Sequence, residues 1–229
     1  MPTPKIEFRN ITKVFQTRSQ TIVAVQDFNM QVEAGDFVSI IGPSGCGKST
    51  LIRMLDGIIQ PSGGELYLDG QKLDTSKKFP REVLRKMGFI FQKPNMLPWY
   101  TIRQNVALPN RIIGNTSKED EEYVDYLLNM VGLSEYRDAY PIEVSGGALQ
   151  RAGVIRAMVH KPEILLMDEP FGALDEMMRE QLNMELLDIW KKTGMTIIFI
   201  THSVEEAVLL SSSIYVMGCL LYTSDAADD

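Results

Sequence analysis

Hydrophobic and polar residues follow two different periods along the chain, and the two periods separate strands from helices. Apolar residues alternate with polar ones over residues 5–14, which predicts a strand with one buried face. Further strands are predicted where short apolar runs occur, at Asp36–Ile41, Glu65–Leu68, Met87–Phe91, Ile164–Met167, Thr196–Ile200 and Ile214–Met217. Helical spacing separates several of these runs, so we expect an α/β core.

The middle of the chain has a helical pattern instead, from Lys93 to about residue 161. Within Glu119–Val131, the residues of one apolar stripe are Tyr123, Val124, Leu127, Leu128 and Val131. We interpret the stretch of about 93–161 as a helical lobe that is inserted into the core. Residues 1–218 would then form a single domain that contains this lobe.

Composition and charge narrow the class of protein. Of the 229 residues, 45% are hydrophobic and 23% are charged, which excludes a disordered or fibrous chain. The net charge of -7 shows no excess of basic residues of the kind that binds nucleic acid, so we expect no nucleic acid as a partner. No apolar run approaches the roughly 20 residues needed to cross a bilayer, and the first residues lack the apolar core of a signal peptide. The two cysteines, Cys46 and Cys219, cannot make a framework of disulfides, which favours a reducing compartment.

Residues 42–49, GPSGCGKS, have the spacing of two glycines, a lysine and a hydroxyl that is typical of a phosphate-binding loop. Glycines let the backbone wrap closely around an anion, so that successive N–H groups and a helix N-terminus face the phosphates. Lys48 would reach the β- and γ-phosphates, Ser49 would ligate Mg²⁺, and Thr50 would add a phosphate contact. Cys46 is best explained as a small loop residue. The nucleotide-binding candidates in this loop are Gly42, Pro43, Ser44, Gly45, Cys46, Gly47, Lys48, Ser49 and Thr50.

Two carboxylates, Asp168 and Glu169, follow the predicted strand at residues 164–167. They would lie at the carboxyl edge of a parallel sheet, where ligands bind in α/β folds. We expect Asp168 to hold Mg²⁺ through water and Glu169 to polarise the attacking water. Gln92 and His202 also follow predicted strands, although a lone Gln or His at a strand end is more often structural than catalytic.

A second anion-binding end is predicted in residues 144–151, VSGGALQR, which precede another helical run. Ser145, Gly146 and Gly147 present a hydroxyl and bare backbone at a helix N-terminus. One chain rarely needs two such ends for one nucleotide, so we expect this end to complete a nucleotide site on a second copy of the chain. The alternative is a simple Ser N-cap with glycines for close packing.

Taken together, these motifs resemble the nucleotide-binding domain of ABC transporters over about residues 5–217. The ordered set consists of the phosphate loop, Gln92, Ser145–Gly147, Asp168–Glu169, Ala173-Leu174-Asp175 and His202. The resemblance implies a P-loop NTPase core with an antiparallel β subdomain and an inserted helical subdomain. It also implies that two copies bind two ATP molecules head to tail, close with ATP and open after hydrolysis.

The resemblance assigns roles to single residues. Phe15 lies where the family keeps an aromatic ring to stack on adenine, and Asp175 matches the family's inter-subunit aspartate. Gln92 lies where the family has a residue that binds Mg²⁺ and takes part in coupling. His202 lies where the family has the residue that acts as the γ-phosphate switch. The catalytic candidates are therefore Glu169, His202 and Gln92. The candidate Mg²⁺ ligands are Ser49, Gln92 and Asp168.

Two segments indicate which ABC transporter ATPases the chain resembles most. The stretch FQKPNMLPWYTIRQNV at residues 91–106 and the run PFGALDEMMREQL are similar to the ATPases of importers for nitrate, sulfonates, taurine and related small anions. Such an ATPase works at the cytoplasmic face of the cell membrane, bound to integral membrane permease subunits and served indirectly by an extracytoplasmic solute-binding protein. We therefore expect a peripheral subunit that hydrolyses ATP to drive solute import.

The signature segment departs from the family's LSGGQ at Val144 and Ala148. We expect the missing amide at Ala148 to remove a polar group near the partner's nucleotide. Two alternatives stay open, a soluble ABC-type ATPase outside transport and a nucleotide-binding regulatory module that no longer hydrolyses ATP. The first usually carries coiled-coil insertions or tandem cassettes, which this chain lacks. The intact catalytic candidates argue against the second, whereas Ala148 argues for it.

The last residues, CLLYTSDAADD at 219–229, do not continue the pattern of strands and turns before them. We expect a non-native or disordered tail, with a frayed native end as the alternative. Cys219, which begins this tail, carries no expected function.

Overall fold

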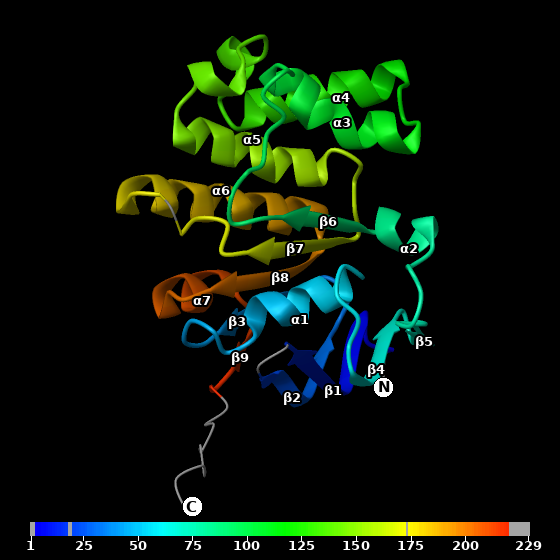
Figure 1. The fold of residues 1–229 in the computed structure, drawn as a ribbon. Coiled ribbons are helices and arrows are strands. Elements are labelled where there is room, and N and C mark those ends of the chain that lie inside the picture. The colour runs from blue at the N-terminus through cyan, green and yellow to red at the C-terminus, as the bar shows by residue number, and fades with distance from the viewer. Residues whose placement is uncertain (1–2, 18–19, 173, 220–229) are drawn as a thin grey trace, which may run out of the picture.

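The computed structural model describes residues 3–17, 20–172 and 174–219, and Figure 1 shows how their elements are arranged. One sheet is antiparallel with the strand order β2-β1-β4-β5, and the other is parallel with the order β6-β7-β8-β3-β9. The antiparallel strands are β1 (Ile6–Gln16), β2 (Thr21–Val32), β4 (Gly63–Leu68) and β5 (Gln71–Lys72). The parallel strands are β3 (Phe37–Ile41), β6 (Met87–Ile90), β7 (Ile164–Asp168), β8 (Thr196–Thr201) and β9 (Ser213–Val216).

The parallel sheet is covered on both faces, which explains why its central strands are apolar at almost every position. All five residues of β7 and all six of β8 are buried. Successive side chains point to opposite faces of a strand, so alternate residues enter different cores. Leu166 and Ile198 belong to the core shared with the antiparallel strands, whereas Leu165 and Ile197 face the core on the other side of the sheet.

Three helices flank the parallel sheet, namely α1 (Lys48–Leu55), α6 (Glu176–Thr193) and α7 (Val204–Leu210). Helix α1 lies between the two sheets, with Leu51, Ile52, Met54 and Leu55 in the shared core (Figure 1). Helix α6 packs Leu182 and Leu186 against the opposite face. This arrangement confirms the expected α/β class with an antiparallel sheet beside a parallel one.

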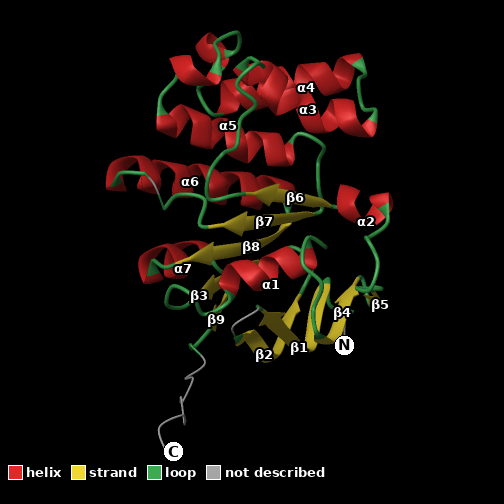
Figure 2. Ribbon diagram, viewed as in Figure 1, coloured by secondary structure: helices red, strands yellow, loops and turns green. Residues whose placement is uncertain are grey.

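The helical lobe consists of α3 (Ile102–Ile113), α4 (Lys118–Met130) and α5 (Gly146–Met158), which Figure 2 shows stacked on one side of the parallel sheet. Thr101 and Ser117 begin α3 and α4 with capping boxes that satisfy free backbone N–H groups. These three helices enclose a separate hydrophobic core. Two 3₁₀ turns, Ser134–Tyr136 and Pro141–Glu143, join α4 to α5, and the short helix α2 (Arg81–Arg85) precedes β6.

The chain packs closely where the lobe meets the parallel sheet. A Cβ atom at Gly88 in β6 would lie 2.2 Å from the carbonyl oxygen of Ala157 in α5, so only glycine permits this approach. Helix α5 is therefore held against the edge strand of the sheet, and this contact sets the distance between the lobe and the residues that follow β6.

Strand β2 was missed by the sequence analysis. Most of its residues are exposed or only partly buried, so it lacks the apolar signal of a core strand. Its partner β1 pairs with it antiparallel, with register shifts between Phe8 and Ile11, Ile11 and Lys13, and Lys13 and Val14. Such irregularities interrupt the period of two on which strand prediction depends.

Across residues 3–219, apart from the gaps at 18–19 and 173, no helix has the length and hydropathy needed to cross a membrane. Of the expected tail at 219–229, all but Cys219 lies outside the described residues.

Candidate functional site

The predicted phosphate loop connects the end of β3 to the start of α1. Gly47 stands at the N-cap of α1 with φ 101°, a left-handed conformation that residues with a Cβ rarely adopt. A Cβ atom there would also lie 2.2 Å from the carbonyl oxygen of Ala24 in β2. Strand β2 therefore packs directly against the loop, and glycine is required at position 47.

Lys48 is held inside the loop and is only 5% exposed. Its ammonium group donates hydrogen bonds to the carbonyl oxygens of Gly42 at 2.7 Å and Pro43 at 3.0 Å. The buried side chain of Cys46 lies beside it, with 3.9 Å between Sγ and the lysine Nζ. Neutral carbonyls are weak partners for a buried cation, so an anion bound in the loop would gain a stronger, charge-assisted bond. The loop therefore fits a phosphate group.

The first helical turn after the loop reaches the end of β7. Ser49 donates a hydrogen bond from its hydroxyl to Asp168 Oδ1 at 2.8 Å. The carboxylate of Asp168 is buried at 4% exposure, and Arg53 approaches its other oxygen at 3.6 Å. A hydroxyl and a carboxylate oxygen this close are suitable ligands for Mg²⁺, which prefers oxygen.

The carboxylate of Glu169 lies next to two other predicted site residues. Gln92 donates from Nε2 to Glu169 Oε2 at 3.3 Å, and His202 Nδ1 is 3.9 Å from the same oxygen. Gln92 lies just beyond β6, Glu169 directly follows β7 and His202 directly follows β8. The carboxyl ends of these parallel strands meet at one edge of the sheet, as their order requires.

The backbone of Glu169 is unusual as well. Its φ is 47°, a left-handed value that costs a residue with a Cβ free energy, and its N–H donates to the carbonyl oxygen of Ile200 at 3.0 Å. This bond to β8 holds the conformation and fixes the direction in which the side chain leaves the strand.

The segment Ser145–Gly147 lies apart from these groups, at the start of α5 in the helical lobe. Ser145 caps the helix by accepting a hydrogen bond from the N–H of Ala148 at 3.2 Å. A Cβ atom at Gly146 would meet nothing within 4 Å, so this helix end is open to solvent. Among the described residues, no hydrogen bond or ion pair joins the segment to Lys48, Asp168 or Glu169.

The side chain of Ala148 does not lie on this open surface. It is 3% exposed and packs in the core of the helical lobe. In the single chain, the departure from the family's glutamine therefore affects lobe packing rather than the exposed helix end.

Two other predicted residues have contacts of their own. Phe15 on β1 is 36% exposed, and the Lys13 ammonium lies 4.9 Å from the centroid of its ring. Asp175 caps α6 by accepting a hydrogen bond from the N–H of Met178 at 3.0 Å. Of the motif Ala173-Leu174-Asp175, Ala173 lies outside the described residues.

The structure adds polar residues that were not among the predicted site residues. Thr201 ends β8, and its hydroxyl donates to the buried carboxylate of Glu206. Ser203 caps α7 by accepting from the N–H of Glu206 at 3.1 Å. The spacing Ser203-x-x-Glu206 is a capping-box pattern and could have revealed this pair. Arg179 of α6 approaches the same carboxylate at 3.8 Å.

Within the part of the chain that the structure describes, no group of three or more His, Cys, Asp or Glu side chains could hold a metal ion alone. Mg²⁺ usually binds through one or two carboxylates together with substrate phosphates and waters. The pair formed by Ser49 and Asp168 therefore fits a metal ion that enters with a nucleotide.

Comparison with known proteins agrees with this geometry. A family model described as ABC transporter matches residues 25–172, which is more than half of the chain. The chain belongs to the ABC transporter family. It is 40% identical over 213 residues to the nitrate import ATP-binding protein NrtD of Synechocystis sp., covering 93% of this chain and 77% of that protein. It is 38% identical to the aliphatic sulfonates import ATP-binding protein SsuB of Bacillus cereus, covering 93% of this chain and 81% of that protein.

A solved structure extends the likeness to three dimensions. The ABC protein superposes on the ATP-binding cassette MJ0796 bound to ADP and Pi, a dimeric post-hydrolysis state, with a TM-score of 0.82 and 32% identity. The match covers 93% of this chain and 94% of that one. Family membership and this likeness establish that the chain binds nucleotide and is an ATPase.

Proposed function

We propose that this ABC ATPase is the energising subunit of an importer and drives uptake of a small solute such as nitrate, a sulfonate or taurine. The observation that carries the proposal is the meeting of Gln92, Glu169 and His202 at one sheet edge. The two import ATPases to which the chain is similar support the transport role and the class of solute.

The phosphate loop binds the nucleotide in this proposal. Lys48 exchanges its bonds with the loop carbonyls for the β- and γ-phosphates, and the loop N–H groups and Thr50 complete the cradle. Ser49, Asp168 and Gln92 would hold Mg²⁺, which would supply positive charge to neutralise the phosphates. Phe15 offers its exposed ring to the adenine.

Hydrolysis then depends on the three residues at the sheet edge. Glu169 accepts a hydrogen bond from the attacking water and draws off its proton. Gln92 donates to the Glu169 carboxylate and so orients the oxygen that receives this proton. His202, whose side chain is 56% exposed beside Glu169, stabilises the charge on the γ-phosphate.

A second copy completes each site. At the helix end Ser145–Gly147, a Cβ atom at Gly146 would meet nothing within 4 Å, so a phosphate of another copy can approach the backbone there closely. Among the described residues, no side-chain hydrogen bond or ion pair joins this helix end to the phosphate loop of the same chain. In a two-fold, head-to-tail pair of chains, each chain would supply its helix end to the phosphate loop of the other. The structurally similar cassette MJ0796 is dimeric.

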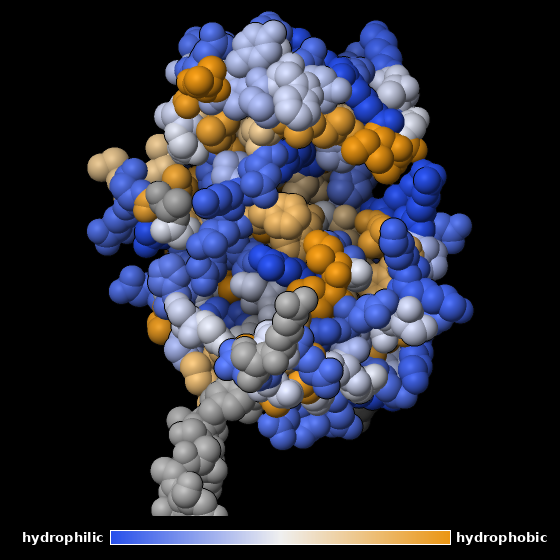
Figure 3. Space-filling model, viewed as in Figure 1, coloured by the Kyte–Doolittle hydropathy of each residue, from blue (hydrophilic) through white to orange (hydrophobic). Residues whose placement is uncertain are grey.

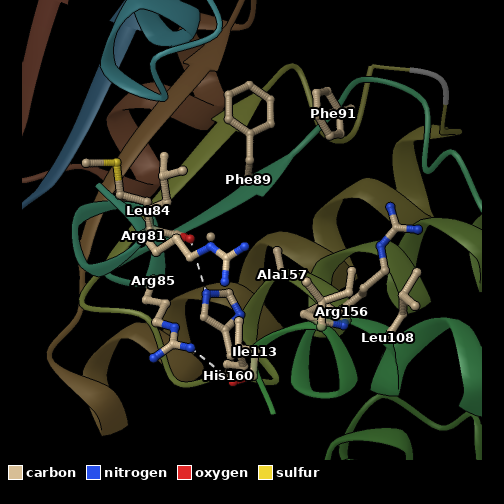
Figure 4. A pocket seen from close by; sticks show the side chains of 14 residues that line it. Arg81, Leu84, Arg85, Phe89, Phe91, Leu108, Ile113, Arg156, Ala157 and His160 are labelled. Atoms are coloured by element: carbon tan, nitrogen blue, oxygen red, sulfur yellow. Dashed lines mark hydrogen bonds between the residues drawn. The ribbon is translucent and has the colours of Figure 1, made fainter. Parts of the chain in front are cut away.

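A groove beside α5 is the proposed contact with the membrane subunits. Its volume is about 490 Å³. Its lining residues include Arg81, Arg85, Phe89, Leu108, Arg156 and His160, which Figure 4 labels. Ile112 also lines the groove. Hydrophobic side chains gather in this hollow between the helical lobe and the sheet (Figure 3). Ile112 is 75% exposed there, which is costly unless another surface covers it.

Charge and position favour a cytoplasmic segment of the permease as the occupant of this groove. Two exposed arginines, Arg81 and Arg85, flank apolar lining residues in a protein of net charge -7, so an amphipathic helix with an acidic residue fits both features. The floor includes Phe89 and Phe91, and Gln92 comes next in the chain. An occupant of the groove therefore touches the segment that carries a catalytic residue. The protein would act at the cytoplasmic face of the membrane, and a solute-binding protein would serve it only through the permease.

Reconstitution tests the proposal. The chain is combined in vesicles with the permease subunits encoded beside it, and ATP-driven uptake of labelled nitrate, taurine and an alkanesulfonate is measured, with Glu169→Gln as the inactive control. We expect uptake of one of these anions with the parent chain and none with the control. Hydrolysis without uptake of any of them would indicate an ATPase outside this transport class, and nucleotide binding without hydrolysis would indicate a regulatory module.

A further inference from the structure

A buried ionic contact lies behind His202. Glu206 on α7 is 7% exposed and accepts a hydrogen bond from the hydroxyl of Thr201, the residue before His202. The N–H of Ser203, the residue after His202, donates to the same hydroxyl at 3.0 Å. The backbone on both sides of His202 is thus tied to the carboxylate of Glu206.

Arg179 reaches this carboxylate from α6. It donates from one terminal nitrogen to the carbonyl oxygen of Leu174 at 2.8 Å, and its Nε lies 3.8 Å from Glu206 Oε1. Arg179 therefore contacts both the loop between Glu169 and α6 and the element that carries His202.

The ring of His202 needs such support. More than half of its side chain is exposed, and its approach to Glu169 at 3.9 Å is too long for a hydrogen bond. The ring is therefore placed by its backbone rather than by contacts of its own. The backbone is placed by Thr201 and Ser203, and both depend on Glu206.

The contact is a poor stabiliser of the fold. Arg179 Nε and Glu206 Oε1 are both buried and make no hydrogen bond, although they face each other. Buried polar atoms that lose hydration without a full hydrogen bond cost free energy. The contact between Arg179 and Glu206 therefore contributes mainly by holding the neighbouring residues Thr201 and Ser203 in place.

We propose that Arg179 and Glu206 are positioning residues for ATP hydrolysis, which set the place of His202 relative to Glu169. This inference rests on the proposed catalytic roles of Glu169 and His202. Neither Arg179 nor Glu206 contacts the phosphate loop, so the pair acts on the rate of hydrolysis and leaves nucleotide binding alone.

The experiment compares Arg179→Met and Glu206→Gln with the parent chain. Arg179→Met keeps the length of the side chain and removes its charge, and Arg137→Met, in the helical lobe, is the matched control. The measurements are kcat and KM for ATP, the dissociation constant by calorimetry, thermal unfolding, and hydrogen exchange of a peptide spanning residues 200–206.

We expect each of the two variants to lower kcat about tenfold, while KM and the dissociation constant stay within about twofold. Because both residues act through one contact, the double variant should be no slower than the slower single variant. Hydrogen exchange should rise at residues 200–206, and Arg137→Met should behave like the parent.

Unchanged kcat in both variants, or a loss that follows the fraction of unfolded protein, would overturn the proposal. If Arg179→Met does not fold, Arg179→Lys replaces it, since it keeps the charge and loses the planar donor fork. A normal kcat in Arg179→Lys, with normal exchange at residues 200–206, would equally refute it. Glu169→Gln tests the proposed function separately from the role of Arg179 and Glu206. The proposed function predicts that Glu169→Gln abolishes hydrolysis, and this prediction does not depend on whether Arg179 positions His202.

Discussion

The Ser49 hydroxyl donates a hydrogen bond to the Asp168 carboxylate over 2.8 Å, although 119 positions separate the two residues in the chain. Ser49 lies in the first turn of α1, and Asp168 is the last residue of β7. Strand β8 lies between β7 and β3 in the sheet, so the start of α1 reaches past one strand to make this bond. The phosphate loop and the acidic strand end are thereby joined into one site.

Glu169→Gln should bind ATP but hydrolyse it at least about a hundredfold more slowly, because a group that takes a proton acts in the transition state. The substitution preserves the size of the side chain. Phosphate release measures the rate, and calorimetry with Mg-ATP checks binding. Equal steady-state hydrolysis in variant and parent would rule out the catalytic role of Glu169.

Lys48→Ala should raise the dissociation constant for Mg-ATP about ten- to a hundredfold, because the phosphate loop loses the cation that the loop carbonyls now hold. Calorimetry measures the effect. Lys77→Ala is the control, since that lysine side chain is 79% exposed and forms a surface ion pair with Asp74. An unchanged affinity in Lys48→Ala would mean that the lysine does not reach the phosphates.

Gly146→Asp should prevent the ATP-dependent dimer while the single chain still binds ATP. The substitution puts a side chain and a negative charge at the exposed helix end, where the backbone must approach phosphates. Sedimentation is measured with the slow variant Glu169→Gln, with and without Mg-ATP. A dimer that forms equally well in the combined variant would exclude this segment from the partner's site.

Ile112→Glu should weaken binding of the permease and leave the basal ATPase rate of the isolated chain unchanged. The charge would enter the apolar groove, away from the phosphate loop. Co-purification with the membrane subunits measures binding. Met184→Glu on α6 controls for an added surface charge, because that methionine is 52% exposed outside the groove. Equal recovery of the permease with both variants would argue against docking in the groove.

Asp56→Asn should stabilise the chain at pH 8 by up to about 3 kcal/mol and have little effect near pH 4. Burial raises the pKa of Asp56, at the C-cap of α1, to about 6. The raised pKa means that the folded state favours the protonated form, so its contribution to stability is present below pH 4 and is lost as pH rises through 6. Unfolding in urea at pH 4.5 and pH 8 measures the difference. A gap between variant and parent that does not grow with pH would contradict this assignment.

Much of the site could be predicted because its signals are local. The phosphate loop is a single contiguous segment. Asp168 ends, and Glu169 directly follows, a strand whose five residues are all buried. Gln92 and His202 follow strands of the same parallel sheet, so strand direction places both at one edge, and the strand order β6-β7-β8 brings them to either side of Glu169. The helical lobe was recognised from the period of its apolar stripes, which depends only on helix geometry.

Other features could not be predicted, because they depend on contacts between distant segments. Strand β2 lacks a buried face over most of its length, and only its pairing with β1 makes it a strand. The burial of the Ala148 side chain in the core of the helical lobe also depends on packing between helices that are distant in the sequence.

The sequence by itself determined which residues are the candidates for the nucleotide chemistry, since a phosphate loop and a pair of acids at a strand end each occupy adjacent positions in the chain. Only the tertiary structure decided how these residues are held. The contact between Arg179 and Glu206 joins α6 to α7, and the groove at Ile112 is lined by residues of both α3 and β6. Such arrangements follow from how helices and strands pack around shared cores, and no local period or spacing along the chain encodes that packing.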